Sequence, residues 1–215
     1  MLDKEKDAAE MAVRRQRMLE ISYRLFAEKG IEAVSLPEIA NACGYGRATL
    51  YRYFSTKLSL VIAAGAWMWE QHIYKWMLLT PEKEQEEMSA ARQFEHYLDF
   101  FIDLYRNHRD LLRFNQFFNI YMRGESASEE QMSPYMDMIR EARSRFHIIY
   151  QKAQNDHTVR TDESEDKVFT ATMHLMMAAV TRYAVGLVYT PEKGTGDEEE
   201  LILLKKMLMR EYART

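Results

Sequence analysis

Cysteine, proline and glycine are all scarce in this chain of 215 residues. Cys43 is the single cysteine, so an intramolecular disulfide and a zinc site built from several thiolates are excluded. Four prolines and eight glycines are too few to separate many short strands. Val and Ile together number 19, against 55 for Leu, Ala and Met. Because unbranched side chains favour helices and β-branched ones favour strands, the composition predicts an all-α fold.

A long apolar run is also missing. The longest notable stretch without Asp, Glu, Lys or Arg is Val168–Thr181, well short of the roughly 20 residues that span a bilayer. The first ten residues alternate in charge and lack the apolar segment of a signal peptide. We therefore expect no membrane partner and a cytoplasmic location.

The net charge of −4 is unevenly distributed. Residues 14–60 carry eight Lys and Arg against four Glu, whereas residues 61–215 carry 19 basic and 25 acidic side chains. The first part therefore has a net charge of +4 and the second a net charge of −6. This asymmetry favours an anionic partner for the N-terminal part, such as nucleic acid.

Apolar periodicity and breaker residues predict the helices. We expect a flexible arm over residues 1–10 and helices near 12–29, 36–43, 47–54, 57–79, 90–107, 110–122, 130–154, 163–189 and 197–212. The segment Ser35-Leu-Pro-Glu38 has the pattern of a capping box, in which the Ser35 hydroxyl accepts the Glu38 N–H and the Glu38 carboxylate reaches back. Gly44 then ends this short helix.

Two short helices on either side of Gly44-Tyr45-Gly46 predict a helix-turn-helix. Ala40 supplies the small residue where the helices cross. The expected inner face consists of Leu36, Ile39, Cys43, Leu50 and Phe54, covered by the Met18, Leu25 and Phe26 stripe. Many helical proteins contain such a turn, so this motif alone is a weak signal.

The surrounding residues make the signal specific. Leu25-Phe26 is followed by Gly30, the Ser35 cap, Ile39-Ala40, Gly44 and then Leu50-Tyr51-x-Tyr53-Phe54-x-x-Lys57. Over residues 14–62 this stretch resembles the DNA-binding domain of the tetracycline-repressor (TetR) family of bacterial transcriptional regulators. Tyr45, Gly46 and Ala48 depart from the family's usual residues, which affects the expected base preference.

The resemblance implies a DNA-contacting role for nine residues. Arg47 and Ala48 would read base edges in the major groove, since Arg pairs with guanine and an Ala methyl contacts a thymine methyl. Arg52 would reach a base or a phosphate. The full set is Arg14, Ser35, Arg47, Ala48, Thr49, Tyr51, Arg52, Tyr53 and Lys57. Phe54 is better explained as an aromatic residue of the core, and Tyr53 as a residue that contacts both the core and a phosphate.

The rest of the chain resembles the family only in length and helical layout. The resemblance implies a DNA-binding domain over residues 11–57, a ligand-binding and dimerisation domain over 58–215, and a homodimer through the last two helices. It also implies a pocket for an apolar or aromatic effector, with Trp67, Phe101, Tyr105, Phe114, Phe117, Phe118, Tyr121, Met173, His174 and Met177 as candidates. A filled hydrophobic core explains the same residues, and a hydrogen-bonded core position is the commoner role for a histidine such as His174.

Two other function classes fit less well. Glu95, His96, Asp99 and Asp103 lie at helical spacing and could bind a metal in an enzymatic bundle, but a solvated helix face explains them better. Paired Glu-x-x-His motifs are missing, and we expect no catalytic residue, metal or cofactor. A protein-interaction module with a vestigial DNA-binding head is the third possibility. The favoured interpretation is a homodimeric repressor that a small molecule releases from a pseudo-palindromic operator.

Overall fold

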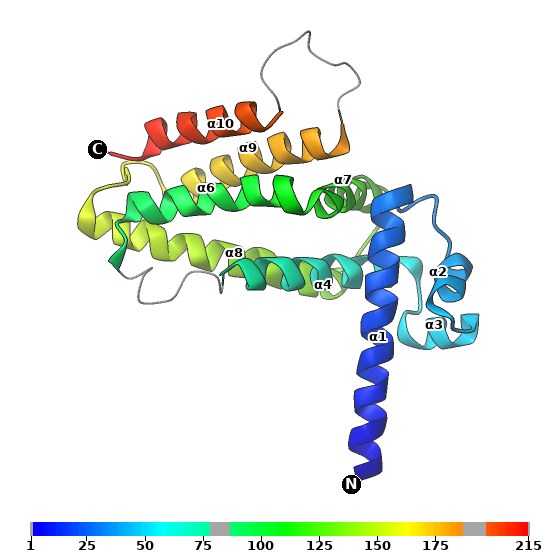
Figure 1. Cartoon of the computed structure of the whole chain (residues 1–215). Helices are drawn as coiled ribbons and strands as arrows, with labels where there is room; N and C mark the ends of the chain where they lie inside the picture. Colours follow the sequence, from blue (N-terminus) through cyan, green and yellow to red (C-terminus); the bar gives the residue numbers. More distant parts are fainter. Residues whose placement is uncertain (1, 78–86, 187–196, 215) are drawn as a thin grey trace. The chain divides into compact units, whose positions relative to one another are not determined.

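The computed structural model describes residues 2–77, 87–186 and 197–214, and its regular structure there is entirely α-helical (Figure 1). This confirms the all-α prediction. The helices are α1 (Leu2–Lys29), α2 (Leu36–Cys43), α3 (Arg47–Tyr53), α4 (Lys57–Met77), α6 (Ala90–Asn107), α7 (Arg109–Gly124), α8 (Glu129–Asp156), α9 (Glu165–Val185) and α10 (Asp197–Tyr212).

Most helix ends agree with the sequence, and α1 is the clear exception. It begins at Leu2 instead of near Ala12, so the expected start of this helix is wrong. Ala8, Ala9 and Ala12 are strong helix formers, and Arg14 pairs with Glu10 one turn earlier. Residues 6–13 are exposed on every side, so no tertiary contact in the described part of the chain supports them. Their flexibility in solution stays a prediction.

The C-terminal end of α9 is determined by a glycine. α9 ends at Val185, before the expected residue 189, because Gly186 takes a φ of +103° that ends the helix. The expected end of the fourth helix at residue 79, and the break over residues 191–196, lie outside the described residues.

The capping box at the start of α2 is half confirmed. The Ser35 hydroxyl accepts the Glu38 N–H at 3.3 Å, as expected. The Glu38 carboxylate does not reach back to Ser35. It accepts instead from Lys29 Nζ at 2.8 Å, which lowers the pKa of this carboxyl. The ion pair with the end of α1 therefore replaces the second half of the predicted motif.

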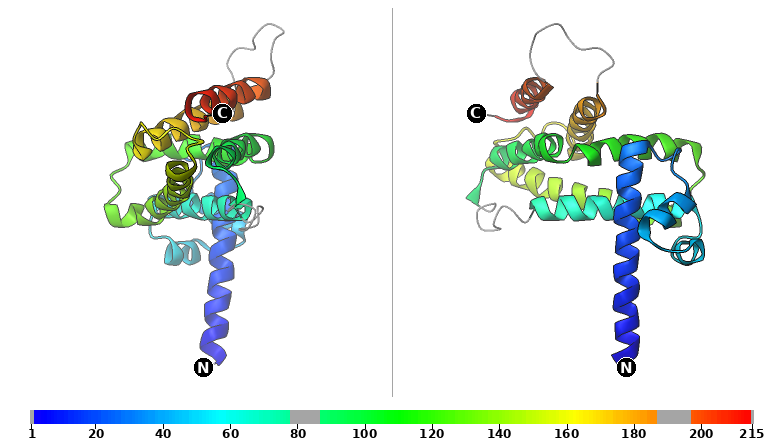
Figure 2. Two further views of the ribbon diagram at one scale, coloured as in Figure 1. Left: turned by 90° about the vertical axis from the view of Figure 1, so that its left-hand side faces the viewer. Right: turned by 45° about the vertical axis from the view of Figure 1, so that its right-hand side comes forward.

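The chain divides into two compact units: unit 1 is Met1–His72 with Arg113–Met138, and unit 2 is Ile73–Leu112 with Ile139–Thr215. The expected boundary after residue 57 falls inside unit 1. In unit 1, α2 and α3 lie beside the C-terminal half of α1, while the N-terminal half of α1 extends past them (Figures 1 and 2). The core of unit 1 includes Met18, Phe26, Ile39 and Leu60, each at most 1% exposed.

In unit 2, α6, α9 and α10 pack against one another (Figure 1). Phe94, Phe101 and Phe146 form the centre of its core, and none is more than 1% exposed. The N-terminus of α6 is held by the end of α8, where an Asp156 carboxylate oxygen accepts the Ala90 N–H at 2.7 Å.

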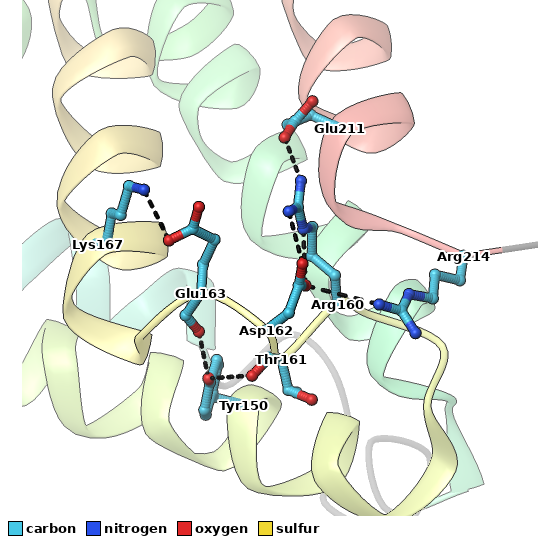
Figure 3. A network of polar contacts seen from close by, with 8 residues as sticks. All are labelled: Tyr150, Arg160, Thr161, Asp162, Glu163, Lys167, Glu211 and Arg214. Carbon is cyan, nitrogen blue, oxygen red and sulfur yellow. Dashed lines mark hydrogen bonds and ion pairs between the residues drawn. The ribbon is translucent and has the colours of Figure 1, made fainter.

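The turn after α8 is tied to the C-terminal end of α10 (Figure 3). The Arg160 N–H donates to the Tyr212 carbonyl at 2.8 Å, next to an isolated antiparallel bridge between Val159 and Ala213. The Arg160 guanidinium pairs with Asp162 at 2.8 Å and with Glu211 at 2.5 Å. Hydrogen bonds from Arg160 lower the pKa of Asp162 to about 2. These contacts fix the end of the last helix to the body of unit 2.

No helix within 2–77, 87–186 and 197–214 has the length and apolar character needed to cross a membrane.

Candidate nucleic-acid interface

The turn between α2 and α3 depends on Gly44. This residue has a φ of +73°, the left-handed conformation that favours glycine. A Cβ added there would meet nothing within 4 Å, so the requirement is conformational and not steric. The turn closes with the Tyr45 N–H donating to the Ala40 carbonyl at 2.9 Å. Ala40 is fully buried, as expected for the residue at the helix crossing.

The predicted inner face of the helix-turn-helix is buried. Ile39, Cys43, Leu50 and Phe54 are each at most 3% exposed, and burial raises the pKa of the Cys43 thiol. The interior therefore holds α3 by one face and leaves the opposite face to solvent.

The exposed side of α3 consists of Arg47, Ala48, Tyr51 and Arg52, and we call it the reading face. The Tyr51 side chain is 48% exposed although it is large and aromatic. Arg47 makes no ion pair with any residue that the structure describes. The Arg52 guanidinium lies 5.8 Å from the centre of the Tyr53 ring. Positions 47, 48, 51 and 52 lie on one side of a helix, so all four side chains can meet the same surface.

The other predicted DNA contacts are placed less uniformly. Ser35 is exposed, but its hydroxyl already caps α2. Thr49 is half-buried. The Tyr53 hydroxyl is buried and has no hydrogen-bond partner among the described residues. Arg14 is half-buried and pairs with Glu10 at 3.2 Å.

The eight basic residues of positions 14–60 fall into two groups. Arg14, Arg24 and Lys29 each pair with a carboxylate. Those that form no ion pair within the described ranges are Arg15, Arg17, Arg47, Arg52 and Lys57. The second group holds the positive charge that is available to a phosphate backbone.

Lys57, the first residue of α4, is oriented from two sides. Its ammonium donates to the Glu32 carbonyl at 3.3 Å and lies 5.7 Å from the centre of the Tyr121 ring on α7. An ammonium has three donors, so this arrangement leaves donor capacity for a phosphate.

Five of the predicted effector contacts lie in unit 1, and four of them form one face of α7. We call Phe114, Phe117, Phe118 and Tyr121 the α7 aromatic stripe. Phe114 lies 5.4 Å from Tyr23, centroid to centroid, and the Trp67 ring lies 6.3 Å from the same tyrosine. The structure therefore packs these candidates against α1 and α4.

The other five candidates lie in unit 2. The Tyr105 hydroxyl donates to Asp197 at 3.0 Å, and Phe101 is buried. Met173 and Met177 are half-buried. His174 is exposed, so the interpretation of this residue as a core histidine is wrong.

Tyr97 packs among the predicted effector contacts of unit 2, but the sequence did not predict it as one of them. Its ring packs 5.3 Å from Phe101 and 5.4 Å from Phe146, and its hydroxyl donates to the Met173 sulfur at 4.0 Å. Burial raises the pKa of this phenol well above its usual range. Its position three residues after Phe94 on one helix face was the available signal.

The acidic cluster considered for a metal is occupied by a lysine. Lys205 Nζ lies 3.1 Å from a Glu95 oxygen and 2.6 Å from an Asp99 oxygen, while Asp103 accepts from Asn107. Among the residues that the structure describes, no three His, Cys, Asp or Glu side chains gather as metal ligands. The cluster therefore joins α6 to α10.

The sequence is similar to known regulators over its first part. A family model described as bacterial regulatory proteins, tetR family, matches residues 19–64. The uncharacterized HTH-type transcriptional regulator YerO of Bacillus subtilis (strain 168) is 30% identical over 95 residues, which are 41% of this chain and 33% of that protein. An HTH-type transcriptional regulator of Staphylococcus aureus (strain USA300) is 47% identical over 55 residues, 26% of this chain and 28% of that protein. The chain thus matches about a third of the length of these relatives.

Solved structures resemble the chain over nearly its whole length. A tetR-family regulatory protein from Rhodococcus RHA1 has a TM-score of 0.70 at 14% identity, covering 94% of this chain and 98% of that one. A regulator from Saccharomonospora viridis in complex with choline has a TM-score of 0.69 at 18% identity, covering 95% and 100%. AibR in complex with isovaleryl coenzyme A and operator DNA has a TM-score of 0.63 at 16% identity, covering 91% and 98%.

At such identities the likeness establishes the fold, with an N-terminal helix-turn-helix and a C-terminal helical domain. The family match covers residues 19–64, so this part of the chain is a helix-turn-helix domain of the tetR family of bacterial regulatory proteins.

Proposed function

We propose that this chain regulates transcription by binding a pseudo-palindromic DNA operator as a homodimer, and that a small molecule releases it. The observation that carries the DNA-binding part is the reading face on α3. Arg47 is exposed there and forms no ion pair with a described residue, and the neighbouring Ala48 is small enough to let the helix approach base edges closely. Three carboxylates, those of Glu10, Glu20 and Glu38, pair instead with Arg14, Arg24 and Lys29 on α1.

The homodimer is supported by two exposed apolar rows. On α9, Leu175 and Val185 are 49% and 47% exposed, and Ala178 lies between them on the same side. On α10, Leu203 and Met207 are 54% and 56% exposed, one helical turn apart. Helices with such rows gain stability by packing against a second pair, which gives a four-helix interface. A dimer would place two reading faces on half-sites roughly 34–36 Å apart.

An effector pocket is supported by two similar structures, the Saccharomonospora viridis regulator in complex with choline and AibR in complex with isovaleryl coenzyme A. For this chain we propose an apolar or aromatic effector, which suits its Met- and aromatic-rich helices. α4 follows α3 in the sequence and runs as one continuous helix from Lys57 to Met77. Displacement of α4 by the effector would change the separation of the two helix-turn-helix domains of the dimer, and this change would lower operator affinity.

The first test is selection of duplex DNA from a random pool by the purified protein, followed by fluorescence anisotropy at two salt concentrations. We expect tight, salt-sensitive binding to the selected sequence that survives competition with random DNA. Equal affinity for selected and random DNA would reject sequence-specific regulation and favour the interaction module. Release is tested with an effector found by this assay. Crosslinking the two helix-turn-helix domains of the dimer at a fixed separation should abolish the response to that effector.

A further inference from the structure

The α7 aromatic stripe is packed against the parts of unit 1 that hold the helix-turn-helix. Phe117 lies 3.6 Å from the place that a Cβ on Gly30 would occupy, in the turn that follows α1. The Phe118 ring lies 3.2 Å from the place of a Cβ on Gly65 of α4, which is tighter than ordinary side-chain contacts. The two helices therefore approach closely because Gly65 has no side chain. α7 is thereby held at a fixed distance from α4.

Tyr121 ends this stripe and reaches the start of α4. Its side chain is 6% exposed, and the Lys57 ammonium lies 5.7 Å from its ring centre. Lys57 is half-buried and its ammonium also donates to the Glu32 carbonyl, in the turn before α2. A lysine side chain has many rotamers, so contacts on two sides restrict where its charge can lie.

The electrostatic surroundings strengthen the contact between ring and ammonium. Burial and a hydrogen bond to the Glu125 carboxylate raise the pKa of the Tyr121 phenol well above its usual range, so the phenol stays protonated and donates. Donation to an anion makes the ring face more negative, which favours a cation over it. The contact places the neutral Tyr121 ring between the Glu125 carboxylate and the Lys57 ammonium.

The place where Lys57 is held suits a phosphate. It is the first residue of α4, and the positive end of a helix dipole attracts anions. The cap is formed by Thr56 and Ser59, with the Ser59 N–H donating to the Thr56 hydroxyl at 3.0 Å. No carboxylate pairs with Lys57 among the described residues, so its charge is not neutralised.

We infer that Tyr121 is a positioning residue for DNA binding: from α7, outside the helix-turn-helix, it holds the Lys57 ammonium where a DNA phosphate meets the start of α4. This inference rests on the proposed DNA-binding function. The restricted lysine loses less conformational freedom when a phosphate binds, which increases affinity for every sequence equally.

The test measures binding to a random-sequence duplex by anisotropy over a salt series. Tyr121→Leu should weaken binding about three- to tenfold, as expected when a rotamer-rich side chain loses its order. Tyr121→Phe keeps the ring and should restore most of the affinity. Lys57→Ala should weaken binding and reduce the salt slope by about one. In the Lys57→Ala background, Tyr121→Leu should change affinity less than about twofold, because its effect acts through the missing lysine.

Phe117→Leu is the matched control, since Phe117 belongs to the same stripe but contacts Gly30. It should leave the affinity for the random-sequence duplex unchanged within about twofold. Equal weakening by Tyr121→Leu with and without Lys57 would overturn the inference, because a general structural role produces additive losses. Full affinity in Tyr121→Leu would overturn it as well. Tyr121→Met, which fills similar space without a ring, replaces the leucine variant if that protein does not fold.

A measurement without DNA separates this inference from the proposed function. NMR relaxation of carbon-labelled lysine side chains should show that Lys57 is more mobile in Tyr121→Leu than in the wild type. Loss of this order supports the positioning role even if the wild-type protein binds no DNA, a result that would reject the proposed function alone. Unchanged Lys57 mobility would reject the positioning role whether or not DNA binds.

Discussion

Arg47 and Arg24 are both exposed arginines of the N-terminal domain, and they differ in their partners. Arg24 pairs with Glu20 at 2.5 Å on α1, whereas Arg47 is unpaired within the described residues and begins the reading helix. We predict that Arg47→Ala costs about 1–3 kcal/mol of binding free energy and relaxes the preference at one base position. Arg24→Ala should have little effect. Anisotropy on the selected operator and its single-base variants measures both, and a uniform loss on all sequences in Arg47→Ala would show a phosphate contact instead.

Tyr53 carries a buried hydroxyl without a partner in the described part of the chain. Such a group lowers stability because it has lost its hydrogen bonds to water. We predict that Tyr53→Phe raises the free energy of unfolding by about 1 kcal/mol, measured by urea denaturation. A lower stability would mean that the hydroxyl is hydrogen-bonded in solution. Because this hydroxyl is buried, the predicted phosphate contact of Tyr53 requires it to change position on binding.

At the residue scale, local motifs were predictable and long-range partners were not. The Ser35 cap and the left-handed Gly44 follow from residue type alone. The partner of Glu38 is Lys29, nine positions away, and no local pattern identifies it. His174 was expected in a core because its neighbours are apolar, but it lies on an exposed side of α9. The described residues of the chain leave that side of α9 uncovered.

Among the helices, α10 is held to the rest of unit 2 by two buried leucines and by charged contacts. Leu201 and Leu208 are buried, while Lys205 bridges to Glu95 and Asp99 on α6. Burial acts to raise the pKa of the Glu95 carboxyl, but hydrogen bonds from Lys205 and Arg92 outweigh it and keep this pKa below its usual value. The ionised carboxylate therefore stabilises the packing of α10.

This arrangement predicts an acid-sensitive contribution to stability. A lowered folded-state pKa gives stabilisation that is complete above the unfolded value of about 4.3 and is lost as the pH falls through the folded value. Lys205→Met should lower the unfolding free energy by about 1 kcal/mol at pH 7, and the difference from wild type should shrink as the pH falls below about 4. Lys167→Met, which removes an exposed pair with Glu163, is the control. A difference that is constant with pH would contradict the electrostatic explanation.

The helices themselves were largely predictable, because apolar periodicity and breakers are local. The partners of the α7 aromatic stripe were not. Its spacing of three and four residues predicts one apolar face, which suits a pocket wall or a packed contact equally well. Only the folded chain brings Phe118 against Gly65, and this contact joins segments about fifty residues apart in the sequence.

On the scale of the whole molecule, the two parts of the chain were predictable to different degrees. The helix-turn-helix is recognisable because its turn, its small crossing residue and its expected DNA contacts each demand particular residue types. The helices of unit 2 need only an apolar face of suitable volume, which many sequences satisfy. The similar structures share the fold of this chain at 12–20% identity. The fold of unit 2 is therefore compatible with many different side chains in its interior.

The dimer is testable by placing a charge in one of the exposed apolar rows. Leu203 on α10 is 54% exposed, and Ile148 on α8 is 59% exposed but lies outside both rows. We predict that Leu203→Glu gives a monomer in light scattering and loses at least about a hundredfold in operator affinity, because one head no longer tethers the other. Ile148→Glu should remain dimeric and bind normally. A dimeric Leu203→Glu with full operator affinity would place the interface on another surface, and the spacing of the two reading faces would then have to be derived from that surface.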